Sequence, residues 1–151
     1  MASSYNKFGV RKKVIDGITF RSSLEANCYK LLRDSGLEFE YEPKKELLSS
    51  GFKMRNTKLY CPDKKKKLIL YEKKILDISY LPDFVVKHGC LSFYIDSKGM
   101  ETPEYKIKKK LFLKKLEETK NNFFFEPHNL SQMSLVIEII KVTIEMYYGK
   151  V

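Results

Sequence analysis

The sequence is poor in the residues that build disulfide frameworks, zinc sites and membrane spans. Its three cysteines, Cys28, Cys61 and Cys90, are odd in number, widely spaced and free of any C-x-x-C pair. This usage indicates neither a disulfide framework nor a zinc site, and we expect reduced cysteines that mostly serve packing. No apolar run approaches the roughly 20 residues of a membrane span, and the first residues lack the apolar segment of a signal peptide. These absences predict a soluble, cytoplasmic protein.

Histidine is also scarce. His88 and His128 are the only histidines, and they lie far apart along the chain. An isolated histidine is more often a surface or hydrogen-bonded side chain than a catalytic base, so we assign neither to catalysis. Tyr94, which falls within a strand-like stretch, needs no role beyond that of an aromatic residue in a sheet.

Positive charge is what the chain has in excess. Lysine and arginine number 29 against 19 acidic residues, which gives a net charge of +10. This balance favours a polyanionic partner, with nucleic acid the first candidate and an anionic membrane surface the weaker one. The chain has 151 residues, of which 43% are hydrophobic and 13% aromatic, so we expect a single domain, residues 1–151, with its own core.

The basic residues fall into three groups. Residues 1–13 form a basic N-terminal arm that is suited to lying along a phosphate backbone, although a solvated tail explains it about as well. Residues 49–74 are expected to form an inserted hairpin or loop, which either projects onto DNA or is simply solvated. A third group lies on the helix expected over 102–119. The candidate DNA-binding residues are Lys7, Arg11, Lys12, Lys13, Lys64, Lys65, Lys66, Lys67, Lys106, Lys109 and Lys110.

Local patterns predict an α/β fold with a small mixed central sheet flanked by helices. Asp16-Gly17 predicts a hairpin turn, and Ser22 or Ser23 is a helix cap with Gly36 beyond the helix end. Thr102-Pro103 opens another helix, with the hydroxyl as cap. We expect strands over residues 14–15, 18–20, 38–48, 81–86, 91–99 and 123–125, and helices over 23–34, 102–119 and 131–148.

The segment 131–148 is unusually apolar for a surface helix. Only Glu138, Lys141 and Glu145 form a polar stripe along it. Its β-branched residues would also fit a strand, but polar residues at steps of three and four favour a helix. The other faces carry more apolar surface than a single surface helix needs to bury against its own core, so the outer part of the helix is a candidate dimer interface.

Two adjacent strands are expected to bring two acids and a lysine together. Along residues 91–99, alternate side chains point to opposite faces, which puts Asp96 and Lys98 on one face. Asp83 lies beside them in the preceding strand. Two neighbouring carboxylates repel each other unless a cation lies between them, and Mg²⁺ prefers oxygen ligands. A lysine next to such an ion can orient water or stabilise phosphate charge, so the group has the chemistry to cut a phosphodiester.

The triplet acid-x-lysine is common in so basic a chain, and a rival site is possible at Asp63, Glu72 and Lys74. Asp63, however, adjoins four lysines in an expected loop, where an exposed charge would hold a metal poorly. Asp83 and Asp96 are joined to strand-like residues that can fix their positions. The sequence context therefore favours a site at Asp83 and Asp96 over one at Asp63.

Glu25 has two interpretations. Ser22-x-x-Glu25 has the spacing of a capping box, in which the glutamate accepts hydrogen bonds from free N–H groups of the helix. Alternatively, this glutamate in the first turn faces the metal. Spacing alone favours the cap.

Glu25, then Pro82-Asp83, then Asp96-Ser97-Lys98-Gly99 resembles the motif of the PD-(D/E)xK nuclease superfamily. The core of that superfamily is helix, three strands, helix, strand. The wider pattern is similar to a phage-encoded branch described as endonucleases or Holliday-junction resolvase-like proteins. That pattern consists of Lys7-Phe8-Gly9, Asp16-Gly17-Ile18-Thr19-Phe20, Ser23-Leu24-Glu25-Ala26 and Lys98-Gly99 with Thr102-Pro103.

The resemblance implies a role for each matching residue. Asp83 and Asp96 would bind Mg²⁺, or Mn²⁺ as a substitute, with help from the Ser97 carbonyl and from Glu25 directly or through water. Lys98 would position the attacking water and stabilise the transition state. The resemblance also implies a homodimer that makes paired cuts with 5′-phosphate and 3′-hydroxyl ends.

The leading hypothesis is a metal-dependent endonuclease that is selective for branched DNA such as Holliday junctions. Basic residues spread over several segments suit phosphate contact, and no base-reading module is evident. One alternative is a sequence-specific or transposition-type endonuclease on the same core. Another is a DNA-binding or assembly protein without catalysis, in which the acids are only structural.

Overall fold

The expected α/β class is confirmed by a computed structural model, which describes residues 12–150. The N-terminal candidates Lys7 and Arg11 lie outside the described residues. The elements are β1 (Lys13–Ile15), β2 (Ile18–Phe20), α1 (Ser23–Asp34), β3 (Glu40–Tyr41), β4 (Glu46–Ser49), β5 (Leu59–Pro62), β6 (Leu68–Tyr71), β7 (Ile78–Tyr80), β8 (Phe84–His88), β9 (Leu91–Ile95), α2 (Pro103–Leu116), β10 (Asn122–Phe125) and α3 (Leu130–Tyr148).

The first hairpin and helix form where the sequence predicts them. Asp16 and Gly17 join β1 to β2 with φ angles of 51° and 78°, the left-handed pair that a tight hairpin turn requires. The Ser22 side chain caps α1 by accepting a hydrogen bond from the backbone N–H of Glu25. Gly36, with a φ of 79°, follows the end of the helix.

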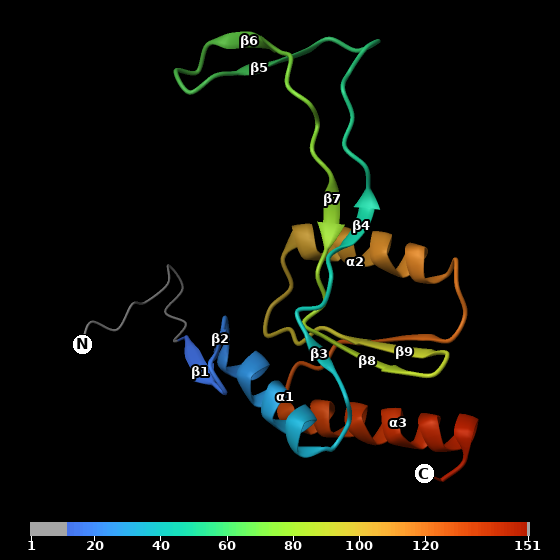
Figure 1. The fold of residues 1–151 in the computed structure, drawn as a ribbon. Coiled ribbons are helices and arrows are strands. Elements are labelled where there is room, and N and C mark those ends of the chain that lie inside the picture. Colours follow the sequence, from blue (N-terminus) through green and yellow to red (C-terminus); the bar gives the residue numbers. More distant parts are fainter. Residues whose placement is uncertain (1–11, 151) are drawn as a thin grey trace, which may run out of the picture.

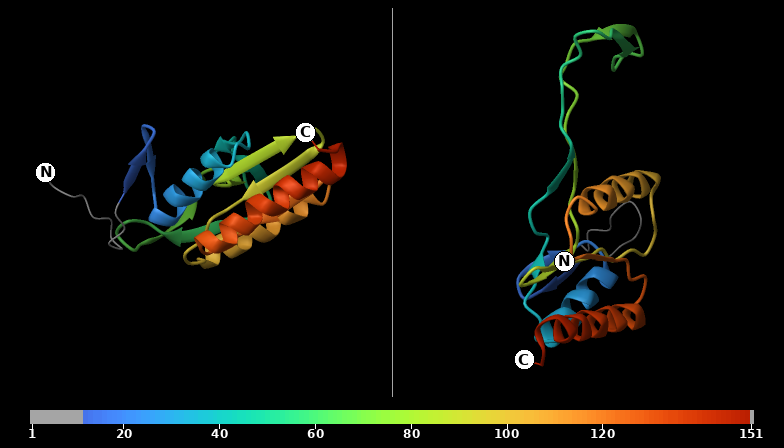
Figure 2. Two further views of the ribbon diagram at one scale, coloured as in Figure 1. Left: turned by 90° about the horizontal axis from the view of Figure 1, so that it is seen from below. Right: turned by 90° about the vertical axis from the view of Figure 1, so that its right-hand side faces the viewer.

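A four-stranded sheet with the order β10-β9-β8-β3 lies at the centre of the fold. β8 is antiparallel to both β9 and β3, whereas β10 is parallel to β9. α1 and α3 cover one face of this sheet and α2 covers the other (Figures 1 and 2). Three further pairs, β1-β2, β4-β7 and β5-β6, form separate two-stranded sheets.

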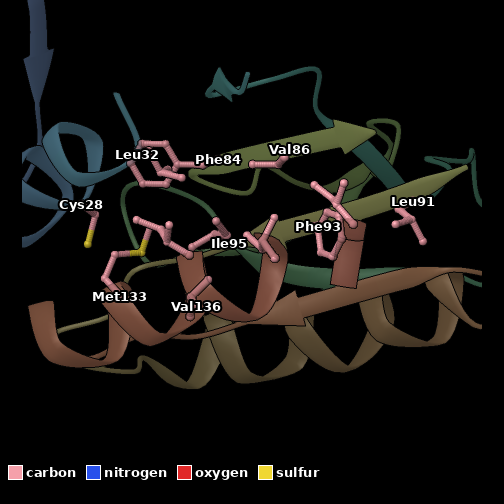
Figure 3. Packing of buried hydrophobic residues seen from close by; sticks show 12 residues of the cluster. Cys28, Leu32, Phe84, Val86, Leu91, Phe93, Ile95, Met133 and Val136 are labelled. Carbon is pink, nitrogen blue, oxygen red and sulfur yellow. The ribbon is translucent and has the colours of Figure 1, made fainter. Parts of the chain in front are cut away.

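The main core lies between the sheet and the pair α1 and α3. Leu91, Phe93 and Ile95 on β9 are fully buried, which confirms the expected alternation along this strand. Met133 and Val136 of α3 lie beside them in the same cluster (Figure 3). On the opposite face, the half-buried Tyr94 meets Phe112 of α2 edge-on at a ring separation of 5.2 Å.

The single strand expected over 38–48 is wrong, because the chain divides there into β3 and β4. Glu42 has a φ of 44°, a conformation that interrupts an extended strand. Pro43 follows and has no N–H to donate to a ladder. β3 therefore joins the central sheet, while β4 leaves it and pairs with β7.

The ends of several other elements differ from expectation. β8 begins at Phe84 rather than at Leu81 and runs to His88, so Asp83 directly precedes the strand. β9 stops at Ile95 rather than at Gly99, yet its pairing direction continues, since the N–H groups of Asp96 and Lys98 donate to Phe125 and Pro127 at 3.0 and 3.1 Å. α2 stops at Leu116, three residues early, and hydrogen-bonded turns follow. The strand expected over 123–125 is present as β10, but it is half-buried rather than buried.

Residues 49–74 form an extended insertion between β4 and β7, which we call the projection. β5 and β6 pair within it as the expected hairpin, with Leu59 opposite Tyr71 and Pro62 opposite Leu68. Closer to the body, Phe52 and Ile75 form an isolated bridge. Figures 1 and 2 show the β5-β6 hairpin standing away from the three helices.

The last helix is helical as predicted, and it begins at an Asn129 cap. Its inner face packs into the core through residues such as Ile140 and Ile144. None of the helices within residues 12–150 is both long enough and apolar enough to cross a bilayer.

Candidate active site

Strand register brings the two predicted aspartates to the same end of the central sheet. Phe84, the first residue of β8, lies opposite Ile95, the last residue of β9. Asp83 and Asp96 flank this pair on the outer side, and they are only 4% and 1% exposed. Glu25 in the first turn of α1 is 3% exposed and contributes to the electrostatic environment of Asp83.

Asp96 has one satisfied and one unsatisfied carboxylate oxygen. The Tyr80 hydroxyl donates a hydrogen bond to Oδ2. The Lys98 ammonium lies 2.6 Å from Oδ1, but Oδ1 has no hydrogen bond and is buried. The ion pair is therefore close in distance but poorly directed, because a contact of this length with good angles would count as a hydrogen bond. Oδ1 has a countercharge and retains lone pairs that no donor uses.

Asp83 is held by the residue that follows Asp96. Its Oδ2 accepts hydrogen bonds from the backbone N–H and the hydroxyl of Ser97, both at 2.8 Å. Its Oδ1 lies 3.5 Å from the Arg21 guanidinium. Burial raises the pKa of Asp83 to about 7, and the nearby charges of Asp96 and Glu25 add to the rise.

The contacts of Glu25 form half of the expected capping box and leave its interpretation as a metal-facing residue a prediction. Its backbone N–H donates to the Ser22 hydroxyl, as a capping box requires. Its carboxylate, however, accepts from the N–H of Arg21 at 3.0 Å and from the Tyr41 hydroxyl at 3.1 Å. The side chain thus fixes the chain just before α1 and also lies beside Asp83.

Two neighbouring pockets, with volumes of about 530 and 240 Å³, open at this end of the sheet. Both are lined by Arg21, Asp83 and Lys98. The larger pocket also contacts Asp96, and the smaller one contacts Glu25. Each of the four predicted catalytic residues therefore lines at least one of these two pockets.

Three residues of this region carried no clear signal in the sequence. Arg21 lies within ion-pair distance of Glu42 at 2.8 Å as well as of Asp83. Tyr80 binds Asp96, and the Tyr105 ring lies 4.5 Å from the Lys98 ammonium as a cation–π contact. Their roles depend on contacts between distant segments, which a single sequence does not reveal.

A second acidic cluster lies close by. Glu101, Glu126 and His128 offer ligand atoms within 4.8 Å of one another, and among residues 12–150 no other trio of acidic, histidine or cysteine side chains does so. Glu25, Asp83 and Asp96 are thus less tightly grouped. Lys109 already binds Glu101 and Glu126 at 2.9 and 2.8 Å, in the space that a metal ion would need.

The cluster behaves as an ion-pair network that attaches α2 to the segment after β10. Burial alone would raise the pKa of Glu126, but hydrogen bonds from Lys109 and Tyr105 outweigh it and lower the pKa to about 2. The Tyr105 hydroxyl that donates to Glu126 belongs to the same ring that contacts Lys98. The network therefore supports the lysine of the candidate site.

The candidate DNA-binding residues are separated in the structure. Lys106 and Lys109 form ion pairs with acids, whereas Lys110 is exposed. Lys12 is exposed, and Lys13 begins β1. Lys64, Lys65, Lys66 and Lys67 lie at the tip of the projection and line neither pocket.

The rival acid at Asp63 has a local structural role. Its carboxylate accepts hydrogen bonds from the backbone N–H groups of Lys65 and Lys67 at 2.8 and 2.9 Å. It thus closes the turn of its own hairpin. Among the described residues, Asp63 belongs to no trio of acidic, histidine or cysteine side chains within metal-binding range.

Residues 5–132 match the model of a family described as "Protein of unknown function (DUF1064)". The chain belongs to the DUF1064 family. The match includes all four predicted catalytic residues and the whole projection, and it ends near the start of α3. No curated protein matches the sequence. For this DUF1064 member, the activity must therefore be argued from the site itself.

Removing the Tyr80 hydroxyl should destabilise the fold. In Tyr80→Phe, the buried Asp96 loses the donor to Oδ2 while Oδ1 still has none, so we expect the free energy of unfolding to fall by about 1–3 kcal/mol. Urea denaturation measures the change. Tyr60→Phe, at an exposed position of the projection, is the matched control and should be neutral. Equal stability of Tyr80→Phe and the parent would contradict the hydrogen bond.

The pH dependence of stability should carry the signature of Asp83. Its pKa of about 7 in the folded state lies above the value of about 3.9 expected for an unfolded chain. Between these values the folded state keeps the proton and the unfolded state loses it. Its contribution to stability should therefore be largest below about pH 4 and decrease until about pH 7.

Denaturation of Asp83→Asn across pH 5 to 8 tests this signature. The variant should lose the part of the slope that Asp83 contributes, because asparagine does not titrate. Glu138→Gln, at an exposed position of α3, is the control and should keep the slope of the parent. Identical slopes for the parent and Asp83→Asn would show that Asp83 ionises normally.

Proposed function

We propose that this chain is a metal-dependent DNA endonuclease of the PD-(D/E)xK type. The observation that carries the proposal is the pairing of two almost fully buried aspartates, Asp83 and Asp96, with Lys98 at the rim of a pocket. Two neighbouring buried carboxylates are unfavourable when both are ionised. A purely structural role does not require such an arrangement, whereas a divalent cation stabilises it.

The residues fit an ion such as Mg²⁺ or Mn²⁺. Asp96 Oδ1 is a buried oxygen without a hydrogen bond, and oxygen donors are the ligands that hard cations prefer. Asp83, Asp96 and the Ser97 carbonyl would hold the ion, with Glu25 completing the shell directly or through water. Bound there, the ion would lower the pKa of a coordinated water and screen phosphate charge.

The chain's own cations would act on the phosphate. The Lys98 ammonium is 25% exposed and is held between Asp96 and the Tyr105 ring, so it can orient a water or donate to a phosphate oxygen. The Arg21 side chain, 64% exposed beside Asp83, offers a second positive group at the pocket rim. The acids would thus hold the ion while Lys98 and Arg21 contact the substrate.

The order of elements supports the assignment to this superfamily. Its core runs helix, three strands, helix, strand, and α1, β3, β8, β9, α2 and β10 follow in that order along this chain. These four strands form the one central sheet, with the projection inserted between the first and second of them. Agreement in order and in site position is stronger support than the short motif alone.

Branched DNA is the proposed substrate, because basic residues occur on several segments and suit backbone contact more than base reading. A sequence-specific or transposition-type endonuclease would use the same site. A DNA-binding protein without catalysis would keep the acids for structure only.

A cleavage panel tests the proposal. Wild-type protein should cut DNA only with Mg²⁺ or Mn²⁺, and Asp96→Asn should lower the rate by more than about 100-fold, the upper end of the loss caused by changing residues behind a metal ligand. DNA binding by the variant should persist. Glu138→Gln, at an exposed position of α3 far from the pockets in sequence, should retain cleavage.

The choice of DNA in this panel separates the alternatives. A four-way junction should be cut faster than a linear duplex of matching sequence. Equal cutting of both would remove the preference for junctions, and no cutting of any DNA would leave a binding protein.

A homodimer is the proposed assembly. On α3, four exposed apolar residues follow the spacing with which two helices pack side by side: Leu135, Ile139, Val142 and Met146. This stripe lies opposite the buried face of the helix, so we assign it to a second copy of the chain.

Sedimentation equilibrium tests this surface. Ile139→Glu should weaken the dimer by more than about tenfold, because it would bury an unpaired charge. Ser134→Glu, on the same helix but outside the stripe, should not. A parent protein that is monomeric at the concentrations at which it cuts DNA would rule out the dimer.

A further inference from the structure

Most of the net charge of the chain lies on the projection. Residues 49–74 contain nine lysine or arginine residues and two acids, so they carry seven of the ten net positive charges. The other 125 residues, which include the candidate active site, carry only three. Charge is therefore separated in space from the proposed chemistry.

The basic side chains of the projection have no acidic partners. Within residues 12–150, no ion pair joins any lysine or arginine of the projection to an acid. On α2, by contrast, four lysines are paired with acids: Lys106, Lys108, Lys109 and Lys115. The projection thus holds nine lysine or arginine residues within 26 positions, none of them in an ion pair with an acid of the described chain.

The tip of the projection holds its lysines in a defined turn. Asp63 accepts from the N–H groups of Lys65 and Lys67, and Lys66 N–H donates to the Asp63 carbonyl at 3.0 Å. Lys66 has a φ of 61°, as a residue that closes such a turn requires. The acid in the turn is therefore used by the backbone, and four ammonium groups remain directed to solvent.

The hairpin also exposes apolar surface. Tyr60 and Leu68 are 58% and 65% exposed, although both belong to paired strands. An isolated two-stranded hairpin is at most marginally stable in water. A partner that offers both phosphate groups and apolar surface would cover the lysine charges, Tyr60 and Leu68 together.

We propose that the projection docks onto duplex DNA outside the active-site pockets, with Lys64–Lys67 against the phosphate backbone. The proposal rests on the proposed function for its choice of DNA over other polyanions. A two-stranded ribbon has dimensions that the major groove accepts. The projection extends from the β4-β7 pair, and Lys45, Ser79 and Tyr80 at the other end of that pair line the larger pocket. A duplex crossing that pocket would therefore run beside the base of the projection.

The salt dependence of binding tests the docking. Full-length protein is titrated with a duplex in EDTA over a range of NaCl concentrations, so that no cleavage occurs. The slope of log K against log salt is negative, and in a variant with Lys64→Gln, Lys65→Gln, Lys66→Gln and Lys67→Gln its magnitude should fall by up to about 3.6, at about 0.9 per lost phosphate contact. A matched variant with the same four residues changed to arginine keeps the charge and should keep the slope.

The outcomes separate this inference from the proposed function. An unchanged slope in the glutamine variant would overturn the docking, whether or not the parent cuts DNA. A loss of binding to vesicles containing anionic lipid, with DNA binding intact, would overturn it in favour of a membrane contact. A smaller slope in the glutamine variant, together with a parent protein that cuts no DNA, would support the docking and remove the nuclease.

Discussion

The constraint on which the rest of the structure depends is the burial of two carboxylates side by side. The antiparallel register of β8 and β9 fixes it, because Phe84 opposite Ile95 leaves Asp83 and Asp96 next to each other at the end of the sheet. Such a pair is electrostatically unfavourable. It persists because Phe84 and Ile95 are fully buried, so moving either acid outward would disrupt the core. The apolar core thus imposes a geometry that the acids would not adopt alone.

The polar surroundings of the two aspartates come from α2 and from β7, the strand that ends at Tyr80. The Tyr80 ring stacks on the Phe112 ring of α2 with the ring centres 4.6 Å apart, and its hydroxyl donates a hydrogen bond to Asp96. Tyr105, one turn into α2, binds Glu126 and contacts Lys98. One helix therefore positions both the acceptor and the cation of the site. This explains why α2 needs its lysines for internal ion pairs, since they hold the helix in the position from which the tyrosines act.

Much of the fold and the site was predictable from sequence because it depends on local signals. Alternation along residues 91–95, the Asp16-Gly17 turn and the Ser22 cap each act within a few residues. The rest depends on contacts between distant segments. Arg21 gains its role from Asp83, far along the chain, and Lys115 pairs with Glu46 across elements whose packing no local pattern reveals. The break at Glu42 was missed because its alternating neighbours resemble one strand.

The separation of charge from chemistry has a mechanistic reason. A lysine that pairs with an acid takes up a carboxylate oxygen that a divalent cation could use, as Lys109 does at both Glu101 and Glu126, so a cation site is favoured where few lysines lie nearby. Affinity for a polyanion, however, requires many free cations. Seven net positive charges on the projection would supply affinity for a polyanion without adding lysines beside the acids of the candidate site. In the proposed nuclease, Lys98 and Arg21 would contact one phosphate near the pockets, and the projection would supply most of the binding free energy on the same DNA.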